Sequence, residues 1–304
     1  MKIKLIATDL DGTLLKNNNS IDSETTEFLI KFQSKKGILV LITGRRLNEI
    51  SEYIDSLKML DFKTGYIVFC DGQYVWDISN NQIINNQFLT IKDVIFILDH
   101  IKNYSFNVTL YNNKNDFVLL NKQTPLKRII YSLCRTLLKK NGRKKYTFTF
   151  MIPFISSQVV DIEKVVIHTN KLKSKDMHEY FGKFTDHFSN YNITLMEEKK
   201  IEISRKNVNK RDALLQITNS EDLLNDDVLV IGDEGNDVKM LKYFKNSFAM
   251  GNASNYVKQA AMYITDTNEN QGVLKALKKF VGDENDRLGG NTPSGRGQTP
   301  MSSS

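Results

Sequence analysis

Three short runs of chemically active residues stand out in this 304-residue sequence because each directly follows an apolar stretch. The runs are Asp9-Leu10-Asp11-Gly12-Thr13, Thr43-Gly44-Arg45 and Gly232-Asp233-Glu234-Gly235-Asn236-Asp237. The apolar stretches before them, residues 3–8, 38–42 and 228–231, are typical of buried strands. Ligands bind at the carboxyl ends of the strands in an open parallel α/β sheet, so such a fold would bring all three runs together. Carboxylates and a hydroxyl gathered at that edge would suit magnesium-dependent phosphoryl transfer.

Asp9 and Asp11 lie two residues apart where the first strand runs into a loop, so their side chains can point the same way. Gly12 permits the sharp change of direction that follows. Two neighbouring carboxylates repel each other, and a bound cation or protonation of one of them relieves the repulsion. The pair is therefore a candidate for metal binding or general acid catalysis. The alternative is a solvated turn, which the preceding apolar strand disfavours.

The third run places the acidic residues Asp233, Glu234 and Asp237 close together. Mg²⁺ prefers oxygen ligands and commonly takes one or two carboxylates, with water and phosphate completing its coordination. One carboxylate of this run facing Asp9 would complete such a site. The alternative is an acidic first turn that stabilises the dipole of the following helix, and Glu234 is expected to have only that role.

Thr43, Gly44 and Lys210 are candidates for binding an anion. Thr43-Gly44 ends one strand and opens the next helix, where a hydroxyl and free backbone N–H groups form an anion site, although threonine is also a common N-cap. Lys210 lies in the first turn of a helix that is expected to begin near Asn209. A cation opposes the helix dipole there, which indicates an anion nearby, and Asp212 is an alternative partner.

Strand and helix patterns alternate over about the first 80 residues and again from residue 201, which is typical of a parallel sheet with crossover helices. Between them, helical patterns at 94–102, 126–140 and 176–188 mix with strand patterns at 106–110, 117–120, 146–150 and 165–168. We therefore expect an α/β chain with a Rossmann-like parallel-sheet core formed by residues 1–83 and 199–282, and an inserted α+β domain at 84–198. Residues 283–304, which are rich in Gly and Ser, are expected to form a disordered tail.

Turn signals set the expected ends of several core elements. The first helix is expected to begin with Ser23 as its N-cap and to end with Gly37 in the C′ position. An Asp71-Gly72 turn follows a strand pattern at 66–70 and leads into a hairpin that pairs 74–76 with 83–88.

The net charge of +7 is concentrated in the insertion. Residues 83–198 hold 17 of the 42 Lys and Arg residues but only 10 of the 35 Asp and Glu residues, so the rest of the chain is balanced. Much of this surplus is local and comes from Lys139, Lys140, Arg143, Lys144 and Lys145. Such a surface would attract an anionic substrate or nucleic acid, or would simply be a solvated helix end and loop.

Several classes of protein are disfavoured by what the sequence lacks. It has no apolar run of the ~20 residues that a membrane helix needs and no signal-peptide pattern, so a cytoplasmic protein is expected. Cys70 and Cys134 are expected to stay reduced, and neither has an arginine six residues on, which argues against a cysteine-nucleophile phosphatase. All four histidines lie in the insertion, and the absence of a G-x-x-x-x-G-K-[ST] loop argues against a P-loop enzyme.

The combination of four motifs resembles the haloacid dehalogenase superfamily, and in particular its Cof-type phosphatases. The motifs are Asp9-Leu10-Asp11-Gly12-Thr13-Leu14, Leu41-Ile42-Thr43-Gly44-Arg45, Lys210 and Gly232-Asp233-Glu234-Gly235-Asn236-Asp237, in this order. The resemblance covers about residues 1–280 and includes the runs at 249–253 and 271–273. It implies a Rossmann-like core, a large α/β cap inserted between the second and third motifs, and a phosphatase activity that requires Mg²⁺.

The resemblance also implies a role for each motif residue. Asp9 is the expected nucleophile, which forms an aspartyl-phosphate, and Asp11 is expected to protonate the leaving oxygen and then to help deprotonate water. Mg²⁺ is expected on the Asp9 carboxylate, the Asp11 carbonyl and Asp233, with Asp237 orienting the site from outside the metal ligands. Substrate contacts are expected from Thr43, Gly44, Arg45, Lys210 and Asn236. Arg45 alternatively braces its loop.

One departure from the family pattern concerns a loop that is expected to face the substrate. Asp71-Gly72-Gln73 stands where the relatives usually carry Asn-Gly-Ala. The additional negative charge of Asp71 is expected to alter specificity or to repel a second phosphate.

The expected function is therefore hydrolysis of a small phosphorylated metabolite, such as a sugar phosphate, by a Mg²⁺-dependent phosphatase. The alternative is a sugar phosphomutase of the same superfamily, which would pass the phosphoryl group to a sugar. A further alternative is a non-catalytic protein that binds nucleic acid through the basic insertion, and the complete catalytic set argues against it. No membrane partner is expected, and the sequence indicates neither the metabolite nor the oligomeric state.

Overall fold

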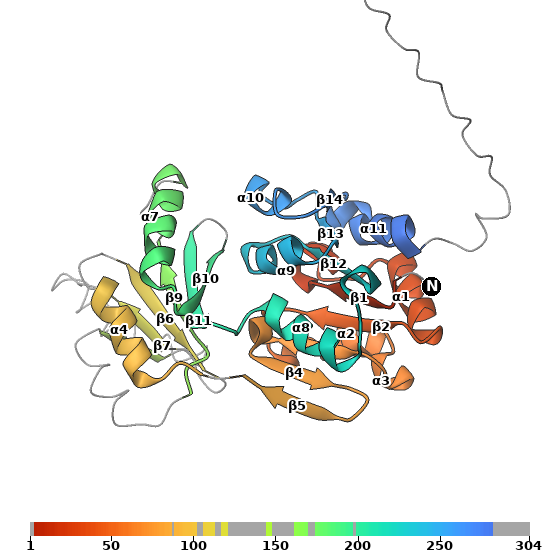
Figure 1. Ribbon diagram of the computed structural model, residues 1–304, viewed down its shortest axis with the longest axis horizontal. Coiled ribbons are helices and arrows are strands. Elements are labelled where there is room, and N and C mark those ends of the chain that lie inside the picture. Colours follow the sequence, from red (N-terminus) through yellow and green to blue (C-terminus); the bar gives the residue numbers. More distant parts are fainter. Residues whose placement is uncertain are drawn as a thin grey trace, which may run out of the picture.

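The computed structural model describes residues 3–86, 88–101, 106–112, 117–120, 144–147, 161–169, 174–196 and 199–281. These residues form two β-sheets with helices packed against them (Figure 1). The predicted helix at 126–140, the basic residues 139–143, Cys134 and the predicted tail at 283–304 lie outside the described residues. Cys70 is a free cysteine.

The first sheet has eight strands in the order β14-β13-β12-β1-β2-β3-β4-β5. The pairs from β14 to β3 are parallel, and β4 and β5 extend the sheet as an antiparallel hairpin. The central strands are almost entirely apolar and buried, as is typical of parallel strands that are covered on both faces. The strands are β1 (Leu5–Thr8), β2 (Ile38–Ile42), β3 (Tyr66–Phe69), β4 (Tyr74–Asp77), β5 (Gln82–Asn85), β12 (Val228–Gly232), β13 (Asn246–Ala249) and β14 (Tyr263–Ile264).

Helices cover both faces of this sheet. One face carries α1 (Ser23–Ser34), α2 (Ser51–Ser56), α3 (Met59–Phe62) and α11 (Gly272–Val281), and the other carries α8 (Lys210–Ser220), α9 (Val238–Tyr243) and α10 (Asn255–Lys258). Side chains alternate along β1, so Ile6 packs in the cluster of Leu29 while Leu5 and Ala7 pack in the cluster of Leu214. The doubly covered parallel sheet confirms the expected α/β class.

Short turns follow several strands of the core. Those at Leu10–Leu14, Cys70–Gly72 and Gly235–Asp237 come after β1, β3 and β12, and carry candidate residues. Because these strands are parallel, the three turns lie at the same edge of the sheet. The other turns are at Leu47–Glu49, Asn225–Asp227 and Asn268–Asn270.

The second sheet belongs to the insertion and has six strands in the order β10-β11-β9-β6-β7-β8. Its pairs are antiparallel except for β7 with β8. Two helices, α4 (Ile91–Ile101) and α7 (Ser174–His187), pack on it through residues such as Val94, Leu98 and Phe184. The expected α+β insertion is therefore confirmed. Its strands are β6 (Asn107–Tyr111), β7 (Phe117–Leu120), β8 (Lys144–Thr147), β9 (Lys164–His168), β10 (Tyr191–Met196) and β11 (Lys200–Arg205).

The strand pairing bears on where the insertion begins and ends. β11 pairs with β9 and β10, so the sheet of the insertion continues past the boundary expected at residue 198. β5 pairs with β4 in the core sheet and extends to Asn85, beyond the boundary expected at residue 83. We therefore propose that the insertion begins after β5 and ends after β11.

The ends of α1 differ from the sequence-based expectation. Asp22, and not Ser23, is the N-cap, because its carboxylate accepts two backbone N–H groups of the first turn. At the other end Lys36, with φ +65°, takes the left-handed position expected for Gly37. Gly37 has a steric role instead, since a Cβ at that position would lie 2.4 Å from the ring of Phe32.

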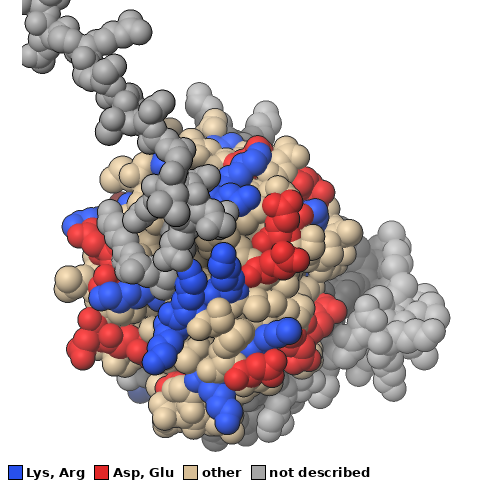
Figure 2. All heavy atoms as spheres, turned by 90° about the vertical axis from the view of Figure 1, so that its right-hand side faces the viewer, with Lys and Arg blue, Asp and Glu red and all other residues tan. Residues whose placement is uncertain are grey.

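The surface of the core carries both signs of charge. Figure 2 shows Lys and Arg side chains interspersed with Asp and Glu over the end of the core that lies at the right in Figure 1. One ion pair of the core, Lys278 with Glu24 (3.7 Å), joins α11 to α1. This mixture agrees with the balanced charge of the sequence outside the insertion. None of the helices that the structure describes combines the length and the apolarity needed to cross a membrane.

Candidate active site

The carboxyl ends of β12, β1 and β2 lie side by side because these strands are neighbours in the sheet. Asp9 directly follows β1, Thr43 directly follows β2 and Asp233 directly follows β12. The N–H of Asp9 donates to the carbonyl of Ile231 (3.1 Å), so the pairing of β1 with β12 continues as far as the candidate residue. The sheet thereby brings together motifs that lie far apart in the sequence.

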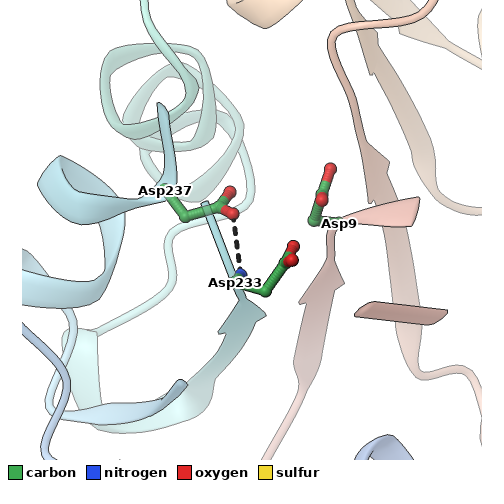
Figure 3. A group of neighbouring side chains, drawn as sticks. All are labelled: Asp9, Asp233 and Asp237. Atoms are coloured by element: carbon green, nitrogen blue, oxygen red, sulfur yellow. Dashed lines mark hydrogen bonds between the residues drawn. The ribbon is translucent and has the colours of Figure 1, made fainter. Parts of the chain in front are cut away.

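Asp9, Asp233 and Asp237 form a cluster in which one carboxylate oxygen of each lies within 4.8 Å of the others. Figure 3 shows the carboxylates of Asp9 and Asp233 pointing in the same direction beyond their strands, with Asp237 reaching the cluster from the following helical turn. Asp9 and Asp237 are buried, whereas Asp233 is half-buried. A cluster made only of oxygen ligands suits a hard cation such as Mg²⁺.

Lys210 lies against this cluster. Its ammonium donates to Oδ1 of Asp9 (2.7 Å) and to Oδ1 of Asp237 (2.8 Å), and its side chain is fully buried. Burial would lower the pKa of Lys210, but the carboxylates of Asp237 and Asp9 outweigh burial and raise it, so the group remains an ammonium. The side chain of Asn209 accepts the N–H of Asp212 (3.0 Å), and this N-cap fixes the start of the helix that carries Lys210.

Asp237 has both carboxylate oxygens engaged within the protein. Oδ1 accepts from Lys210, and Oδ2 accepts the backbone N–H groups of Asp233 (3.0 Å) and Glu234 (3.1 Å). These contacts hold the loop that carries Asp233 and orient Lys210 towards Asp9. Asp237 is therefore the most firmly held member of the cluster, with three hydrogen bonds to its fully buried carboxylate.

The charges of the cluster fit a divalent cation, since three carboxylates face one ammonium. Burial raises the pKa of Asp9 well above its usual value, and the carboxylates of Asp237 and Asp233 raise it further against the opposing effect of Lys210. Burial and the carboxylate of Asp237 raise the pKa of Asp233 to about 7. A cation between Asp9 and Asp233 would relieve this repulsion.

Asp233 is positioned from the loop after β1. Its Oδ1 accepts the hydroxyl of Thr13 (2.9 Å) and its Oδ2 accepts the amide of Asn252 (3.3 Å), which also donates to the carbonyl of Gly12 (2.8 Å). Gly12 has φ +70°, and a Cβ there would lie 2.2 Å from Oδ2 of Asp233. Only glycine therefore combines this backbone conformation with the close approach of the carboxylate.

The side chain of Asp11 is placed differently from those of the carboxylate cluster. Its Oδ2 accepts from Nε of Arg45 (2.8 Å), and its Oδ1 accepts from Nη2 of the same guanidinium. Arg45 also donates to Asn19 (3.1 Å) and to the hydroxyl of Tyr53 (3.4 Å). The side chain of Asp11 is 57% exposed, so it lies at the open side of the site.

Thr43, Gly44 and Asn236 lie around Asp71. The hydroxyl of the buried Thr43 accepts the N–H of Arg45 (3.1 Å), and its carbonyl accepts the N–H of Asp71 (3.0 Å). A Cβ on Gly44 would lie 3.0 Å from Oδ1 of Asp71, and the amide of Asn236 donates to that same oxygen (2.7 Å). The candidate residues of the second and fourth motifs thus meet at the loop after β3.

The insertion closes over this loop. A small cavity has walls from both parts of the chain, with Lys210 and Asn236 from the core and Lys164, Asn192, Thr194, Glu202 and Ser204 from the insertion. The hydroxyl of Tyr74 donates to Glu163 (2.9 Å), which lies next to Lys164 on the insertion. A Cβ on Gly235 would lie 1.7 Å from the carbonyl oxygen of Leu195, so β10 packs directly on the loop of the fourth motif.

Sequence reasoning did not identify Lys164 or Glu202 as candidate residues. Lys164 donates to Asp71 (2.6 Å) and to Glu202 (2.9 Å) across the cavity. Although burial opposes it, the nearby ammonium groups of Lys164 and Lys210 lower the pKa of Asp71 to about 2. Burial raises the pKa of Glu202. The sequence around Lys164 carries no motif, because its position depends on how the insertion folds back on the core.

The comparisons with known proteins agree with this geometry. A sequence model of the haloacid dehalogenase-like hydrolases matches residues 6–277. The chain is similar to the 5-amino-6-(5-phospho-D-ribitylamino)uracil phosphatase YcsE of Bacillus subtilis (strain 168), with 27% identity over 279 residues that cover 92% of this chain and 96% of the relative.

Solved structures show the same fold. One is a haloacid dehalogenase-like hydrolase from Bacteroides thetaiotaomicron (TM-score 0.63, 24% identity, 91% of this chain and 99% of that chain). Another is the HAD subclass IIB sugar phosphatase BT4131 (TM-score 0.68, 18% identity, 92% of this chain and 100% of that chain). The matched family model covers most of the chain, and the parallel core sheet with its inserted cap agrees with it. The chain therefore belongs to the haloacid dehalogenase-like hydrolases, and its core sheet with an inserted cap has the fold of solved structures named as a HAD subclass IIB sugar phosphatase and as a HAD/COF-like hydrolase.

Proposed function

We propose that this protein is a Mg²⁺-dependent phosphomonoesterase that hydrolyses a small phosphorylated metabolite through an aspartyl-phosphate on Asp9. The observation that supports this most strongly is the buried contact of Lys210 with Asp9 (2.7 Å) next to Asp233. It combines a carboxylate nucleophile, a fixed cation and a second carboxylate in one place. A nucleophile that is itself an anion needs such positive charge in order to approach a phosphate.

The metal would be held by the carboxylates of Asp9 and Asp233 and by the backbone carbonyl of Asp11. When bound, Mg²⁺ neutralises charge on the phosphoryl oxygens and relieves the repulsion between the two carboxylates. Asp237 stays outside the metal ligands in this proposal, because its carboxylate is fully buried and is held by the ammonium of Lys210 and by two backbone N–H groups. Asp233, in contrast, is half-buried and, among the residues that the structure describes, accepts only from the side chains of Thr13 and Asn252.

In the first step, a carboxylate oxygen of Asp9 attacks phosphorus while the bond from phosphorus to the ester oxygen breaks. Asp11 gives its proton to that leaving oxygen, so the alcohol departs neutral. In the second step, Asp11 takes a proton from water, and the water oxygen attacks phosphorus. The bond between phosphorus and Asp9 breaks, which releases inorganic phosphate and restores the carboxylate.

Asp11 must exchange partners to act as the acid. In the structure its carboxylate is bound by the guanidinium of Arg45. We propose that Asp11 leaves Arg45 and turns to the ester oxygen when substrate binds, and that Arg45 then remains available to the substrate. The exposure of the Asp11 side chain leaves room for this rotation.

The transferring phosphoryl group would be bound by Thr43, Gly44, Lys210 and Asn236. Thr43 and Gly44 offer a hydroxyl and a backbone N–H at the end of β2, and Lys210 offers the charge. Asn236 would contribute its amide, which Asp71 orients (2.7 Å).

The polar cavity under the cap supports a substrate whose leaving group carries hydroxyls. Asn192, Thr194 and Ser204 of the cap contribute polar groups to its wall. The named relatives act on related compounds, since one is a phosphatase for a phosphoribitylaminouracil and one structural neighbour is a sugar phosphatase. We therefore propose a sugar phosphate or a phosphorylated polyol derivative as the substrate class.

The decisive experiment measures the release of inorganic phosphate from a panel of phosphorylated metabolites and from p-nitrophenyl phosphate, with Mg²⁺ and with a chelator. We expect release that requires Mg²⁺ and that Asp9→Asn abolishes. Asp226→Asn is the matched control, because Asp226 is an exposed acid that precedes β12 and pairs with Lys245 (3.2 Å). Formation of an isomerised sugar phosphate in place of phosphate would identify a mutase, and full activity of Asp9→Asn would remove Asp9 as the nucleophile.

A further inference from the structure

Lys164 reaches from the cap into the cavity that Lys210 and Asn236 also line. It begins β9, and its ammonium contacts the carboxylates of Asp71 (2.6 Å) and Glu202 (2.9 Å). The side chains of Lys164, Asp71 and Glu202 are mostly buried, with exposed fractions of 17%, 14% and 16%. The phosphoryl-transfer steps proposed above use neither Lys164 nor Glu202, and they use Asp71 only to orient the amide of Asn236.

Asp71 contacts the ammonium of Lys164 from the core side of the cavity. Cys70 and Asp71 both have left-handed backbone conformations, with φ +50° and +57°, in the turn after β3. One oxygen of Asp71 accepts from Asn236 (2.7 Å) and the other accepts from Lys164. An unfavourable backbone conformation that is held from both sides places this carboxylate at the junction of the cap and the catalytic loops.

The two lysines that line the cavity differ in the carboxylates that they contact. Lys210 is already engaged by Asp9 and Asp237. The carboxylates of Asp71 from the core and of Glu202 from the cap both accept from the ammonium of Lys164. Glu163 also lines the cavity, where it accepts the hydroxyl of Tyr74 (2.9 Å), so the described lining residues carry three carboxylates and two ammonium groups.

We propose that Asp71 is a specificity-determining residue, which occupies Lys164 and so rejects phosphate esters whose leaving group carries a second anion. This inference rests on the proposed phosphatase function. A substrate bound with its phosphate at Asp9 and Lys210 would direct its leaving group towards the residues that line this cavity, which holds only about 20 Å³ in the structure and must widen to admit that group. A carboxylate or a second phosphate there would compete with Asp71 and Glu202 for one cation, whereas a neutral hydroxylated group can donate hydrogen bonds to both carboxylates.

The substitution Asp71→Asn tests this charge without disturbing the turn. Asparagine adopts the left-handed conformation more readily than most residues, and its side chain has the same shape as that of aspartate. Asp71→Asn removes one negative charge from the cavity wall, while the carboxylate of Glu202 still contacts Lys164. Adding Glu202→Gln leaves Lys164 without a carboxylate partner within this trio and turns the same place into an anion site.

The experiment uses glycerol 3-phosphate and 3-phosphoglycerate, which differ in that a hydroxymethyl group is replaced by a carboxylate. Each is measured as a competitor of p-nitrophenyl phosphate hydrolysis at constant ionic strength with Mg²⁺. We expect the preference for 3-phosphoglycerate over glycerol 3-phosphate to rise about tenfold in Asp71→Asn, and about a further tenfold when Glu202→Gln is added, because each step changes the local charge by one unit. Adding Lys164→Met to the double variant is expected to cancel most of the rise.

This ratio separates a role in specificity from a role in stability, because a loosened site would weaken both competitors equally. A ratio that stays at the wild-type value in both Asp71→Asn and the double variant, while p-nitrophenyl phosphate is still hydrolysed, would overturn the inference and leave the phosphatase proposal intact. The inference would also be overturned if the increased preference for 3-phosphoglycerate persisted after Lys164→Met was added to the double variant. Failure of the wild-type protein to release phosphate from any ester would instead contradict the proposed function.

Discussion

Lys210 and Asp9 are 201 positions apart in the sequence, yet their side chains form a buried ion pair 2.7 Å long. The same ammonium contacts Asp237 at 2.8 Å, so one lysine joins the helix α8, the end of β1 and the turn after β12. A pair that is shielded from water in this way depends on both partners, because either charge left alone would be buried without compensation. The site and the stability of the core are therefore linked through Lys210.

Replacing Lys210 tests this link. Lys210→Met is expected to lower the free energy of unfolding by about 3–5 kcal/mol, because it leaves Asp9 and Asp237 buried without their counter-charge. It is also expected to reduce phosphate release by at least about 10²-fold, since the phosphoryl group loses a fixed cation. Urea unfolding and steady-state kinetics measure the two effects. Lys245→Met, which removes an exposed lysine, serves as the control, and an equal loss of stability in that variant would refute the explanation.

The response to Mg²⁺ is expected to depend on pH. The pKa of Asp233 is about 7 in the folded protein against an ordinary 3.8, so between these values the folded metal-free protein holds a proton that the unfolded chain has released. The contribution of Asp233 to stability therefore falls as the pH rises through this window. Mg²⁺ replaces that proton, so its stabilising effect should grow over the same range.

Thermal unfolding with Mg²⁺ and with a chelator, repeated from pH 5 to pH 7.5, measures this effect. Binding at about a hundred times the dissociation constant contributes ~2.7 kcal/mol, which corresponds to several degrees for a chain of this size. Asp233→Asn is expected to lose the Mg²⁺-dependent shift, and Asp226→Asn to keep it. A shift that is the same at every pH would show that Mg²⁺ does not compete with a proton at this cluster.

Gly12 offers a steric test of the same cluster. Gly12→Ala requires a Cβ 2.2 Å from the Asp233 carboxylate in a backbone conformation with φ +70°. It is therefore expected to displace Asp233, to destabilise the fold by about 1–3 kcal/mol and to remove the Mg²⁺-dependent activity. Gly182→Ala is the matched control, because Gly182 lies in α7 with no atom within 4 Å of its added Cβ. The control is expected to gain about 0.5–1 kcal/mol, since alanine is the better helix former.

The role of Asp11 as the acid can be separated from a general structural role by varying the leaving group. Asp11→Asn is expected to slow the hydrolysis of an alkyl phosphate by about 10²–10⁴-fold, because the departing alkoxide needs a proton. p-Nitrophenyl phosphate releases p-nitrophenolate, which is a stable anion and needs no proton, so its hydrolysis should slow much less. Equal losses for the two esters would show that Asp11 does not donate a proton to the leaving oxygen.

Much of the fold followed from local patterns in the sequence. The apolar stretch Ile38–Ile42 forms β2 with the same bounds, because a fully apolar run of that length between turn signals is stable as a buried parallel strand. The order of the motifs identified the family and the inserted cap. Asp9 and Asp233 were recognised as neighbours, because residues that follow adjacent parallel strands meet at one edge of the sheet.

The tertiary structure alone decided how the side chains of the site pair. Asp237 engages Lys210 and two backbone N–H groups, Asp11 pairs with Arg45, and Asp71 pairs with Lys164 of the cap. These contacts join segments whose distance depends on how the cap folds back on the core and on the path of each loop. Strand and helix periodicity describes which face of an element is buried, and it carries no information about which charged group on another segment will lie opposite.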